Sequence, residues 1–315
     1  MTIKKTQLTK ELIEDILVNY DLGKYKKSSL IKKGHVHSNY ILITENGKFI
    51  LRIFEERNDE QILLEMKLLE KLSPSDIPTP KVIKTIKKEF FIKLNNKNIA
   101  IFTFLTGKHI EDENNITLKQ IENLGTYLGR FHKDLTNFKP QEIKSKHIYN
   151  FDWVRKILKD IKKDLPDFPI KHETYILKIL NELTLHQNLP QGLNHADLHS
   201  GNVLFEGNEV TGIVDFDDCF YGNLLSDVAS GINFWCIDKS VNFEKCKCFI
   251  VAYEKERKLT SQEKDSLYNQ TLLFTLIHLA YWWWLKENWH KEIKQLRVLK
   301  LLIQTPEEEF MKKLF

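Results

Sequence analysis

The chain has 315 residues, of which 42% are hydrophobic and 29% charged, with only 12 glycines and 8 prolines. This composition is typical of a folded protein and excludes long disordered or low-complexity segments. The formal net charge of +4 comes from lysines spread along the whole sequence, which argues against a nucleic-acid partner. At this length we expect one unit built from two packed lobes.

No segment has the character of a membrane span or an export signal. The longest apolar stretch, Leu272 to Leu285, has about 14 residues, whereas a bilayer requires ~20. Residues 1–20 carry charges where a signal peptide needs an apolar core. We therefore expect a cytoplasmic protein with no membrane partner and with free cysteine thiols. The cysteines are Cys219, Cys236, Cys246 and Cys248.

The N-terminal elements are clearly patterned. Residues 8–20 space their apolar side chains as a helix does, and Gly23 follows the predicted end of this helix. Two segments with strand character, 40–44 and 48–54, flank the turn residues Glu45-Asn46-Gly47. An Asn-Gly turn between apolar runs predicts a β-hairpin.

A second helix is predicted at 59–72, before prolines 74, 78 and 80. Strands are then predicted at 81–86, 89–94 and 99–104. Residues 1–104 should therefore form an N-terminal lobe, an antiparallel sheet with one inserted helix.

Helical patterns dominate the rest of the chain, 105–315, which we expect to form the C-terminal lobe. The lobe boundary is predicted within 105–115, so the fold class is α+β with two lobes. The helices are predicted at 117–135, about 150–165, about 171–187 and within 225–304, and only 194–216 interrupts them.

This interruption holds the residues that indicate chemistry. Between Val203 and Phe216 the pattern predicts a hairpin joined through Gly207-Asn208. Asn202 directly precedes the first strand of this hairpin and Asp215 follows the second, so the two side chains should lie close together. An amide oxygen and a carboxylate are hard ligands that suit Mg²⁺.

Asp197 lies five positions before Asn202 on the loop that enters the same place. Phosphoryl transfer needs an oriented hydroxyl, a base near it, and cations on the phosphates. Asp197 would accept the proton of a substrate hydroxyl, and Asn202 and Asp215 would hold Mg²⁺ on ATP. His195 would brace the loop.

The pattern His195-x-Asp197-x₄-Asn202, followed thirteen positions later by Asp215, resembles the catalytic and metal loops of the aminoglycoside phosphotransferase superfamily. That superfamily has a protein-kinase-like fold. The later Asp227-Val-Ala resembles its helix-opening motif, whose carboxylate braces the catalytic loop.

Within that superfamily the sequence is most similar to the type II homoserine kinases, over nearly its whole length. The resemblance implies a small-molecule kinase that uses ATP. The similar runs are Gly34 to Tyr40, Phe49 to Glu55, Leu128 to His132, Leu189 to Gly192 and Leu224 to Cys236.

The same resemblance assigns a nucleotide site. Gly34 to Tyr40 would cover the phosphates, Arg52 and Glu65 would be the basic and acidic partners, and Phe102 to Gly107 would be the hinge beside adenine. The sequence departs from protein kinases in lacking Gly-x-Gly-x-x-Gly and in having Arg52 instead of Lys. The residues assigned to nucleotide binding are Ser38, Asn39, Arg52, Glu65 and Phe104.

The acceptor, the oligomeric state and the choice of ATP or GTP stay open. Asp217 and Asp218, which differ from the expected homoserine kinase pattern, favour a cationic acceptor group, and homoserine, aminoglycosides, choline-like alcohols and hydroxylysine all carry one. An antibiotic phosphotransferase, for which Asp238 is also suggestive, is one alternative. A catalytically silent nucleotide-binding module is the other.

Simpler interpretations stand beside these. His195, Asp197 and His199 could form a metal cluster of a hydrolase, whereas His199 alone is expected to be a solvated loop residue. Arg52 and Glu65 could be a surface ion pair. Consecutive rings at Trp282 to Trp284 point in different directions on a helix, so they could be core or wall the acceptor pocket.

Overall fold

The computed structural model describes residues 5–32, 36–112, 115–138, 150–164, 170–285 and 289–315. The chain divides into two compact units. The first comprises Met1–Gly107 with Thr211–Val214, and the second comprises Lys108–Val210 with Asp215–Phe315.

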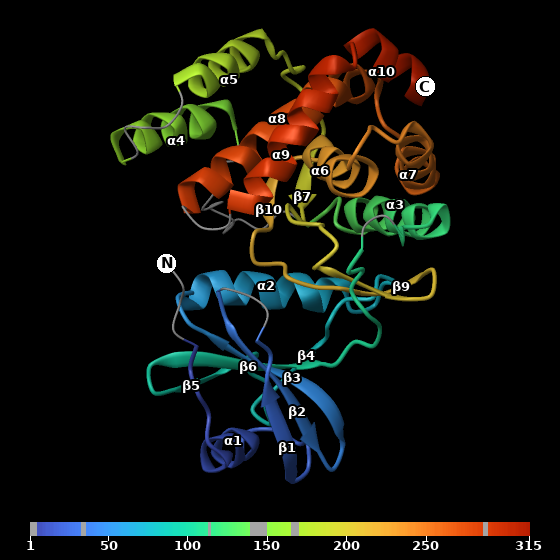
Figure 1. Ribbon diagram of the computed structural model, residues 1–315. Helices are drawn as coiled ribbons and strands as arrows, with labels where there is room; N and C mark the ends of the chain where they lie inside the picture. Colours follow the sequence, from blue (N-terminus) through green and yellow to red (C-terminus); the bar gives the residue numbers. More distant parts are fainter. Residues whose placement is uncertain (1–4, 33–35, 113–114, 139–149, 165–169, 286–288) are drawn as a thin grey trace. The chain divides into compact units, whose positions relative to one another are not determined.

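The first unit is built on a six-stranded sheet with the order β1-β2-β3-β6-β4, in which β5 also pairs with β6 (Figure 1). All of these pairings are antiparallel, as expected. The predicted hairpin is present, with Thr44 opposite Gly47 at its tip. The strands are β1 (Tyr25–Leu30), β2 (Ser38–Thr44), β3 (Gly47–Phe54), β4 (Val82–Ile83), β5 (Ile92–Leu94) and β6 (Lys97–Thr103).

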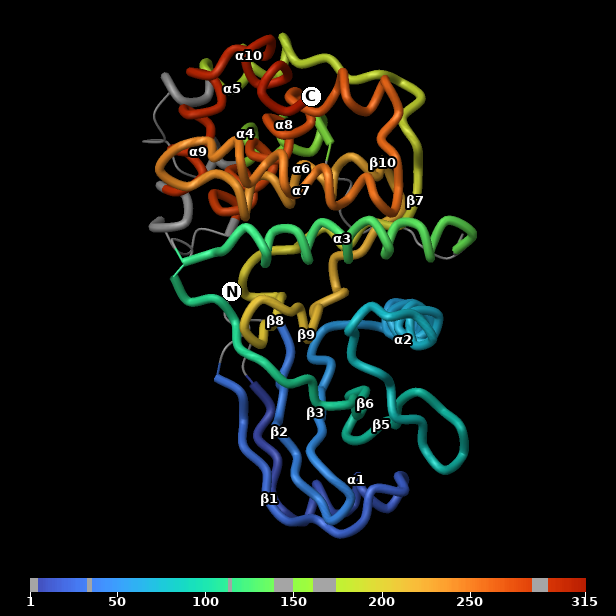
Figure 2. The backbone as a smooth tube through the Cα atoms, turned by 90° about the vertical axis from the view of Figure 1, so that its right-hand side faces the viewer, coloured from blue at the N-terminus to red at the C-terminus, as the bar shows by residue number. Residues whose placement is uncertain are grey.

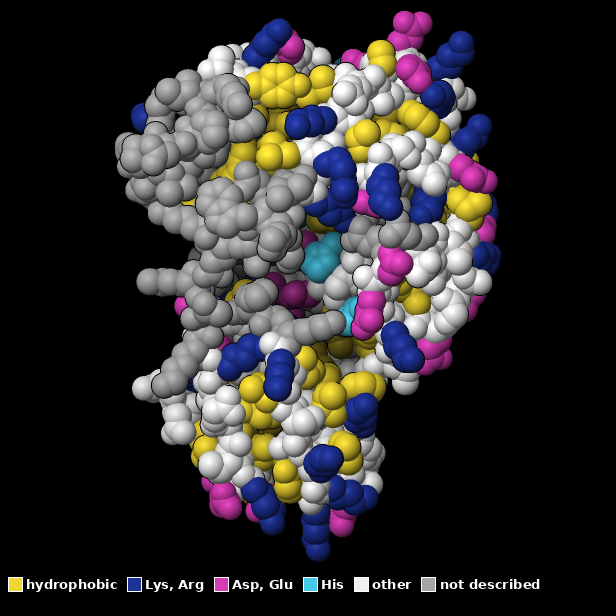
Figure 3. All heavy atoms as spheres, viewed as in Figure 1, with side chains coloured by type: hydrophobic (Ala, Val, Ile, Leu, Met, Phe, Trp, Pro, Cys, Tyr) yellow, Lys and Arg dark blue, Asp and Glu magenta, His cyan; other side chains and the backbone are white. Residues whose placement is uncertain are grey.

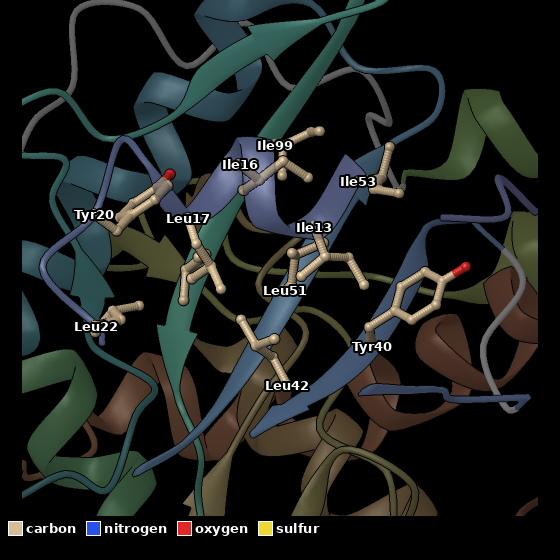
Figure 4. Close-up of a cluster of buried hydrophobic side chains, with 11 residues drawn as sticks. Ile13, Ile16, Leu17, Tyr20, Leu22, Tyr40, Leu42, Leu51, Ile53 and Ile99 are labelled. Atoms are coloured by element: carbon tan, nitrogen blue, oxygen red, sulfur yellow. The ribbon is translucent and has the colours of Figure 1, made fainter. Parts of the chain in front are cut away.

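Helix α1 (Lys10–Leu17) covers one face of this sheet. Its side chains Ile13 and Ile16 belong to a buried cluster with Leu42 of β2 and Leu51 of β3 (Figure 4). Side chains alternate between the two faces of a strand, so residues two positions apart, such as Tyr40 and Leu42 of β2, point into the same cluster. Burial of these apolar side chains is the main contribution to the stability of the contact between α1 and the sheet.

Helix α2 (Asp59–Leu72), seen end-on in Figure 2, lies on the side of the sheet to which Arg52 points. Arg52 points away from the α1 side because it alternates with Leu51, and its guanidinium contacts Glu65 of α2. The helix begins with a capping box in which Asn58 and Gln61 satisfy each other's backbone N–H groups.

The second unit is mainly helical and confirms the expected α+β class. The two-stranded sheet β10-β7 belongs to this unit. In the two-stranded sheet β8-β9, strand β8 belongs to this unit, whereas residues 211–213 of β9 belong to the first. The helices are α3 (Leu118–Asp134), α4 (Phe151–Asp164), α5 (Ile170–Glu182), α6 (Leu225–Cys236), α7 (Phe243–Glu256), α8 (Ser261–Leu285), α9 (Trp289–Gln304) and α10 (Glu307–Leu314). The strands are β7 (Gln191–Asn194), β8 (Val203–Glu206), β9 (Glu209–Ile213) and β10 (Phe220–Asn223).

Helices α3 and α7 pack with their backbones in close approach at two glycines of α3. A Cβ atom on Gly125 would lie 2.4 Å from the carbonyl oxygen of Phe249, and one on Gly129 would lie 2.7 Å from that of Tyr253. Such distances leave no space for a side chain. The close approach brings His132, one turn beyond Gly129, against Tyr253.

The surface agrees with the sequence expectations on charge. Figure 3 shows Lys and Arg side chains spread over one face, with Asp and Glu side chains among them. Of the helices that the structure describes, none combines the length and apolarity of a membrane span. The four cysteines are free thiols, as expected.

Substituting Gly125 tests the α3–α7 contact. Gly125→Ala should lower the free energy of unfolding by about 1–3 kcal/mol, because the new methyl group overlaps a backbone oxygen that does not move cheaply. Urea unfolding followed by circular dichroism measures the change. Thr126→Ala, on the same helix, is the control and should stay within about 0.5 kcal/mol of the wild type. Equal stability of the two variants would contradict this packing.

Candidate active site

The candidate catalytic loop runs from the end of β7 to the start of β8. Asp227, in the first turn of α6, accepts hydrogen bonds from the backbone N–H groups of His195 at 2.6 Å and Ala196 at 2.8 Å. Ala196 has φ +72°, a left-handed conformation that costs a non-glycine residue about 1–3 kcal/mol. The buried carboxylate therefore holds the loop in a strained shape immediately before Asp197.

His195 lies inside this loop rather than at its surface. It is 2% exposed, its ring packs at 4.7 Å from that of Phe216, and its Nδ1 accepts a hydrogen bond from the backbone N–H of Asp197. This position fits the bracing role expected for His195.

Asp197 is held by two neighbouring side chains. The Nδ2 of Asn202 donates to the Asp197 backbone oxygen at 2.8 Å and to its Oδ2 at 3.0 Å. The Nε2 of His199 lies 3.4 Å from the same Oδ2. Burial opposes ionisation, but the hydrogen bond and charge of His199, with the charges of His278 and His195, lower the pKa of Asp197 to about 2. The carboxylate is therefore ionised at neutral pH.

His199 is more than the solvated residue that the sequence suggested. Its side chain is 39% exposed, yet its Nδ1 accepts from the Gly201 N–H at 2.8 Å, so Nε2 carries the proton that faces Asp197. A Cβ on Gly201 would lie 2.5 Å from the His199 ring. The exposure and loop position of His199 agree with the expectation, and the Gly201 hydrogen bond adds a fixed ring orientation.

Asn202 and Asp215 have the oxygen chemistry that a hard cation requires. Both side-chain hydrogen bonds of Asn202 use Nδ2, so its amide oxygen is the group left to bind a cation. Asp215 follows β9 with φ +69°, another left-handed residue. The donor set therefore fits Mg²⁺. Among the described residues, no group of three or more His, Cys, Asp or Glu is placed to hold a metal, which leaves the hydrolase-type cluster without support.

Carboxylates gather near Tyr281 of α8. Burial, followed by the negative charges of Asp218, Asp197 and Asp215, raises the pKa of Tyr281 to about 12. Of the neighbouring rings, Trp283 is 4% exposed and belongs to the core, whereas Trp284 is 48% exposed. The rings therefore do point in different directions, as the helical spacing predicted.

A small cavity lies beside the catalytic loop. On α8, His278 packs its ring 4.4 Å from that of Phe274, and burial lowers the pKa of His278 to about 4 despite the opposing charge of Asp197. No sequence pattern indicated this cavity, because its walls come from segments far apart in the chain. It is lined by Ala196, Phe220, Ser226, Asp227, Gln270, Phe274, Ile277 and His278.

In the first unit, Arg52 and Glu65 form the expected pair. Arg52 Nη1 donates to Glu65 Oε1 at 3.0 Å, and Arg52 Nε donates to Asn39 Oδ1 at 3.0 Å. The side chains of Arg52 and Glu65 are 14% and 3% exposed, so the pair is buried and not a surface ion pair. Arg57 also contacts Glu65, at 3.5 Å.

The other residues assigned to nucleotide binding are engaged within the first unit. Ser38 is fully buried in β2, where its hydroxyl donates to Glu55 and accepts from the N–H of Thr6. The ammonium group of Lys48 lies 3.6 Å from the ring centroid of Phe104. Of the expected phosphate loop, Gly34 and His35 lie outside the described residues.

Comparisons with known proteins define the class. Residues 28–245 match the APH phosphotransferase enzyme family, so the chain belongs to that family. The homoserine kinase of Methylobacillus flagellatus is 28% identical over 261 residues, which cover 82% of this chain and 79% of the relative. That of Bradyrhizobium diazoefficiens is 29% identical over 290 residues, which cover 88% and 86%.

Solved structures support the fold. The amicoumacin kinase hAmiN gives a TM-score of 0.68 at 18% identity, covering 93% of this chain and 96% of that one. A microcompartment-associated aminopropanol kinase gives 0.64 at 16% identity, covering 96% and 98%. Spectinomycin phosphotransferase gives 0.63 at 18% identity, covering 99% and 98%. The protein-kinase-like fold is therefore confirmed, and the family match makes the chain a phosphotransferase.

The buried carboxylate of Glu55 makes the stability of the first unit depend on acidity. Burial opposes its ionisation, but hydrogen bonds from Lys97, Ser38 and Thr6 lower the pKa of Glu55 to about 2. A depressed folded-state pKa stabilises the fold above the unfolded-state value, about 4.3, and this contribution is lost as the pH falls toward 2.

Glu55→Gln should therefore lower the free energy of unfolding by about 1–3 kcal/mol at pH 7. The difference from the wild type should shrink as the pH falls from about 4.5 toward 2. Urea titrations at a series of pH values measure both effects, with the exposed neighbour Glu56→Gln as the control. A difference that stays constant with pH would contradict the ionised role of Glu55.

Proposed function

We propose that the protein is an ATP- and Mg²⁺-dependent kinase that phosphorylates a hydroxyl group of a small amino alcohol, with homoserine as the first candidate acceptor. The observation that carries this proposal is the ionised Asp197, held by Asn202 and His199 at the end of a loop that Asp227 constrains. A fixed, ionised carboxylate of this kind can receive a hydroxyl proton in a defined geometry.

Asp197 acts as the base. It orients the acceptor hydroxyl and accepts its proton as the oxygen bonds to the transferred phosphoryl group. Asn202, through its amide oxygen, and Asp215, through its carboxylate, would hold the metal. Mg²⁺, when bound, would offset negative charge on the phosphates of ATP.

The first unit supplies the nucleotide site in this proposal. Arg52 would contact phosphate oxygens, because a guanidinium group presents several donors in one plane and Glu65 fixes its direction. Asn39, which accepts from Arg52, would belong to the same site. The hydroxyl of Ser38 is already bonded to Glu55 and Thr6, so its side chain would not contact the nucleotide. Phe104 would lie beside adenine.

Two observations support a cationic acceptor. The negative charges of Asp197, Asp215 and Asp218 all act on Tyr281, and an aromatic ring with carboxylates near it favours an ammonium group. The relatives at 28–29% identity over most of the chain are homoserine kinases, and homoserine carries such a group. A cytoplasmic location is part of the proposal.

An antibiotic phosphotransferase is the second candidate, because the same carboxylates suit a polycation such as an aminoglycoside. Asp238, however, is bound by Arg297 at 2.7 Å, which offsets its charge. A silent nucleotide-binding module is the third candidate, and retention of Asp197, Asn202 and Asp215 together argues against it.

Replacing the base tests the proposal directly. Asp197→Ala should reduce kcat by about 10²- to 10⁴-fold, the usual contribution of a positioned base, while the dissociation constant of Mg²⁺-ATP stays unchanged. Steady-state kinetics and calorimetric titration measure the two quantities. Asp134→Ala, an exposed substitution on α3, is the control. Full activity of Asp197→Ala would exclude Asp197 as the base.

A further inference from the structure

A chain of buried hydrogen bonds runs from the catalytic loop into the helices behind it. His132 of α3 contacts Asp227 Oδ2 through Nε2 at 3.2 Å and the Tyr253 hydroxyl through Nδ1 at 2.7 Å. The same hydroxyl accepts from Arg257 Nη1 at 2.9 Å. The side chains of His132 and Asp227 are fully buried, and Tyr253 is 0% exposed.

The donor and acceptor chemistry of these groups allows one favourable direction of proton donation, from Arg257 through Tyr253 and His132 to Asp227. Arg257 is a donor only, so the Tyr253 oxygen accepts from it and has its own proton left to donate. His132 Nδ1 receives that proton, so the neutral ring carries its hydrogen on Nε2 and donates it to Asp227. Burial also lowers the pKa of His132, in spite of the opposing effect of Asp227, which keeps the ring neutral.

The opposite tautomer is disfavoured on both sides of the ring. A proton on His132 Nδ1 would leave the Tyr253 hydroxyl proton without an acceptor among the contacts of that hydroxyl. It would also turn the lone pair of Nε2 toward the oxygen of Asp227, which accepts from His195 as well. Each link thus fixes the next.

Glu263 holds Arg257, the residue at the far end of this series of hydrogen bonds. Arg257 Nη2 donates to Glu263 Oε1 at 2.9 Å, and Glu263 Oε2 accepts from the N–H of Thr260 at 2.9 Å. Glu263 is 0% exposed in the first turn of α8. The hydrogen bonds therefore connect α3, α6, α7 and the start of α8 to one carboxylate of the catalytic loop.

We propose that His132 and Tyr253 are positioning residues of the phosphoryl-transfer reaction, which act through Asp227 to hold the strained Ala196 and the base Asp197 in a catalytic geometry. This role rests on the proposed function. Asp227 binds two backbone N–H groups of the loop, so a shift of its carboxylate moves the residue before the base. Small displacements of a base reduce the rate without weakening nucleotide binding.

Nitrogen-15 NMR of the histidine rings in the wild-type enzyme reads the hydrogen-bond direction without any activity. The result expected for His132 is a neutral ring with a protonated Nε2 and an unprotonated Nδ1 at pH 7. Loss of the His132 ring signals in His132→Gln assigns them. A ring protonated on Nδ1, or on both nitrogens, would overturn the proposal.

Matched substitutions of His132 test the catalytic role. The amide nitrogen of Gln reaches the position of Nε2 and keeps the donor to Asp227, whereas Asn is too short to reach it. His132→Gln should keep kcat within about threefold of the wild type, and His132→Asn should lose about 10- to 100-fold, as for a hydrogen bond to a charged group. KM for ATP should not change in either. Equal kcat values in the two variants would overturn the role.

Tyr253→Phe is compared with Tyr268→Phe, because the Tyr268 hydroxyl also makes a buried hydrogen bond, to the Leu302 oxygen at 3.0 Å, away from the loop. Both should lower the thermal midpoint, but only Tyr253→Phe should lower kcat, by about three- to tenfold. Equal kcat values would reduce Tyr253 to a structural residue and overturn the proposal for it.

The two proposals fail in different ways. If the wild type phosphorylates no acceptor, the proposed function fails, and slow hydrolysis of ATP serves as the rate for comparing the His132 variants. If the wild type is active and His132→Asn is as active as His132→Gln, the function stands and the positioning role fails.

Discussion

The carboxylate of Asp227 is the constraint on which the candidate active site depends. It binds the N–H groups of two successive residues, His195 and Ala196, and the second of these has a left-handed backbone. A strained residue persists only where its surroundings over-determine it. Because Asp197 comes next in the chain, the same contacts decide where this proposed base lies. The buried carboxylate of Asp227 serves to position the loop, because buried ionic groups contribute little net stability.

Arg52 and Glu65 apply the same principle in the first unit. Their ion pair is buried between β3 and α2, and Asn39 adds a further acceptor for Arg52. A buried pair of this kind fixes the direction of a guanidinium group more than it stabilises a sheet. In the proposed function this direction would aim the Arg52 cation at phosphate oxygens of the nucleotide.

Features with local causes were predictable from the sequence. The 40–54 hairpin follows from an Asn-Gly turn between apolar segments. Asp197, Asn202 and Asp215 all lie within one short segment, so their spacing could be read directly from the sequence. Features made by distant partners were not predicted. Strands β7 and β10 pair Asn194 with Phe220, and neither segment is long enough to show alternation.

The supporting side chains were the least predictable part of the site. His132 and Tyr253 are 121 residues apart, and only the packing of α3 on α7 brings them together. The segment 81–86 was expected to be a strand, but only Val82–Ile83 pairs, because the backbone at Thr85 bonds Glu89 in a turn instead. Sequence spacing therefore indicated the candidate reacting groups, whereas the residues that hold them required the fold.

The most direct test of the account is ADP release in a coupled assay with Mg²⁺-ATP and a panel of acceptors, with Asp197→Ala as the blank. The panel contains homoserine, other amino alcohols, choline, methylthioribose and aminoglycosides. The account predicts that one amino alcohol, homoserine first, supports ADP release far above the blank. Binding of ATP with no release above the blank for any acceptor would contradict it.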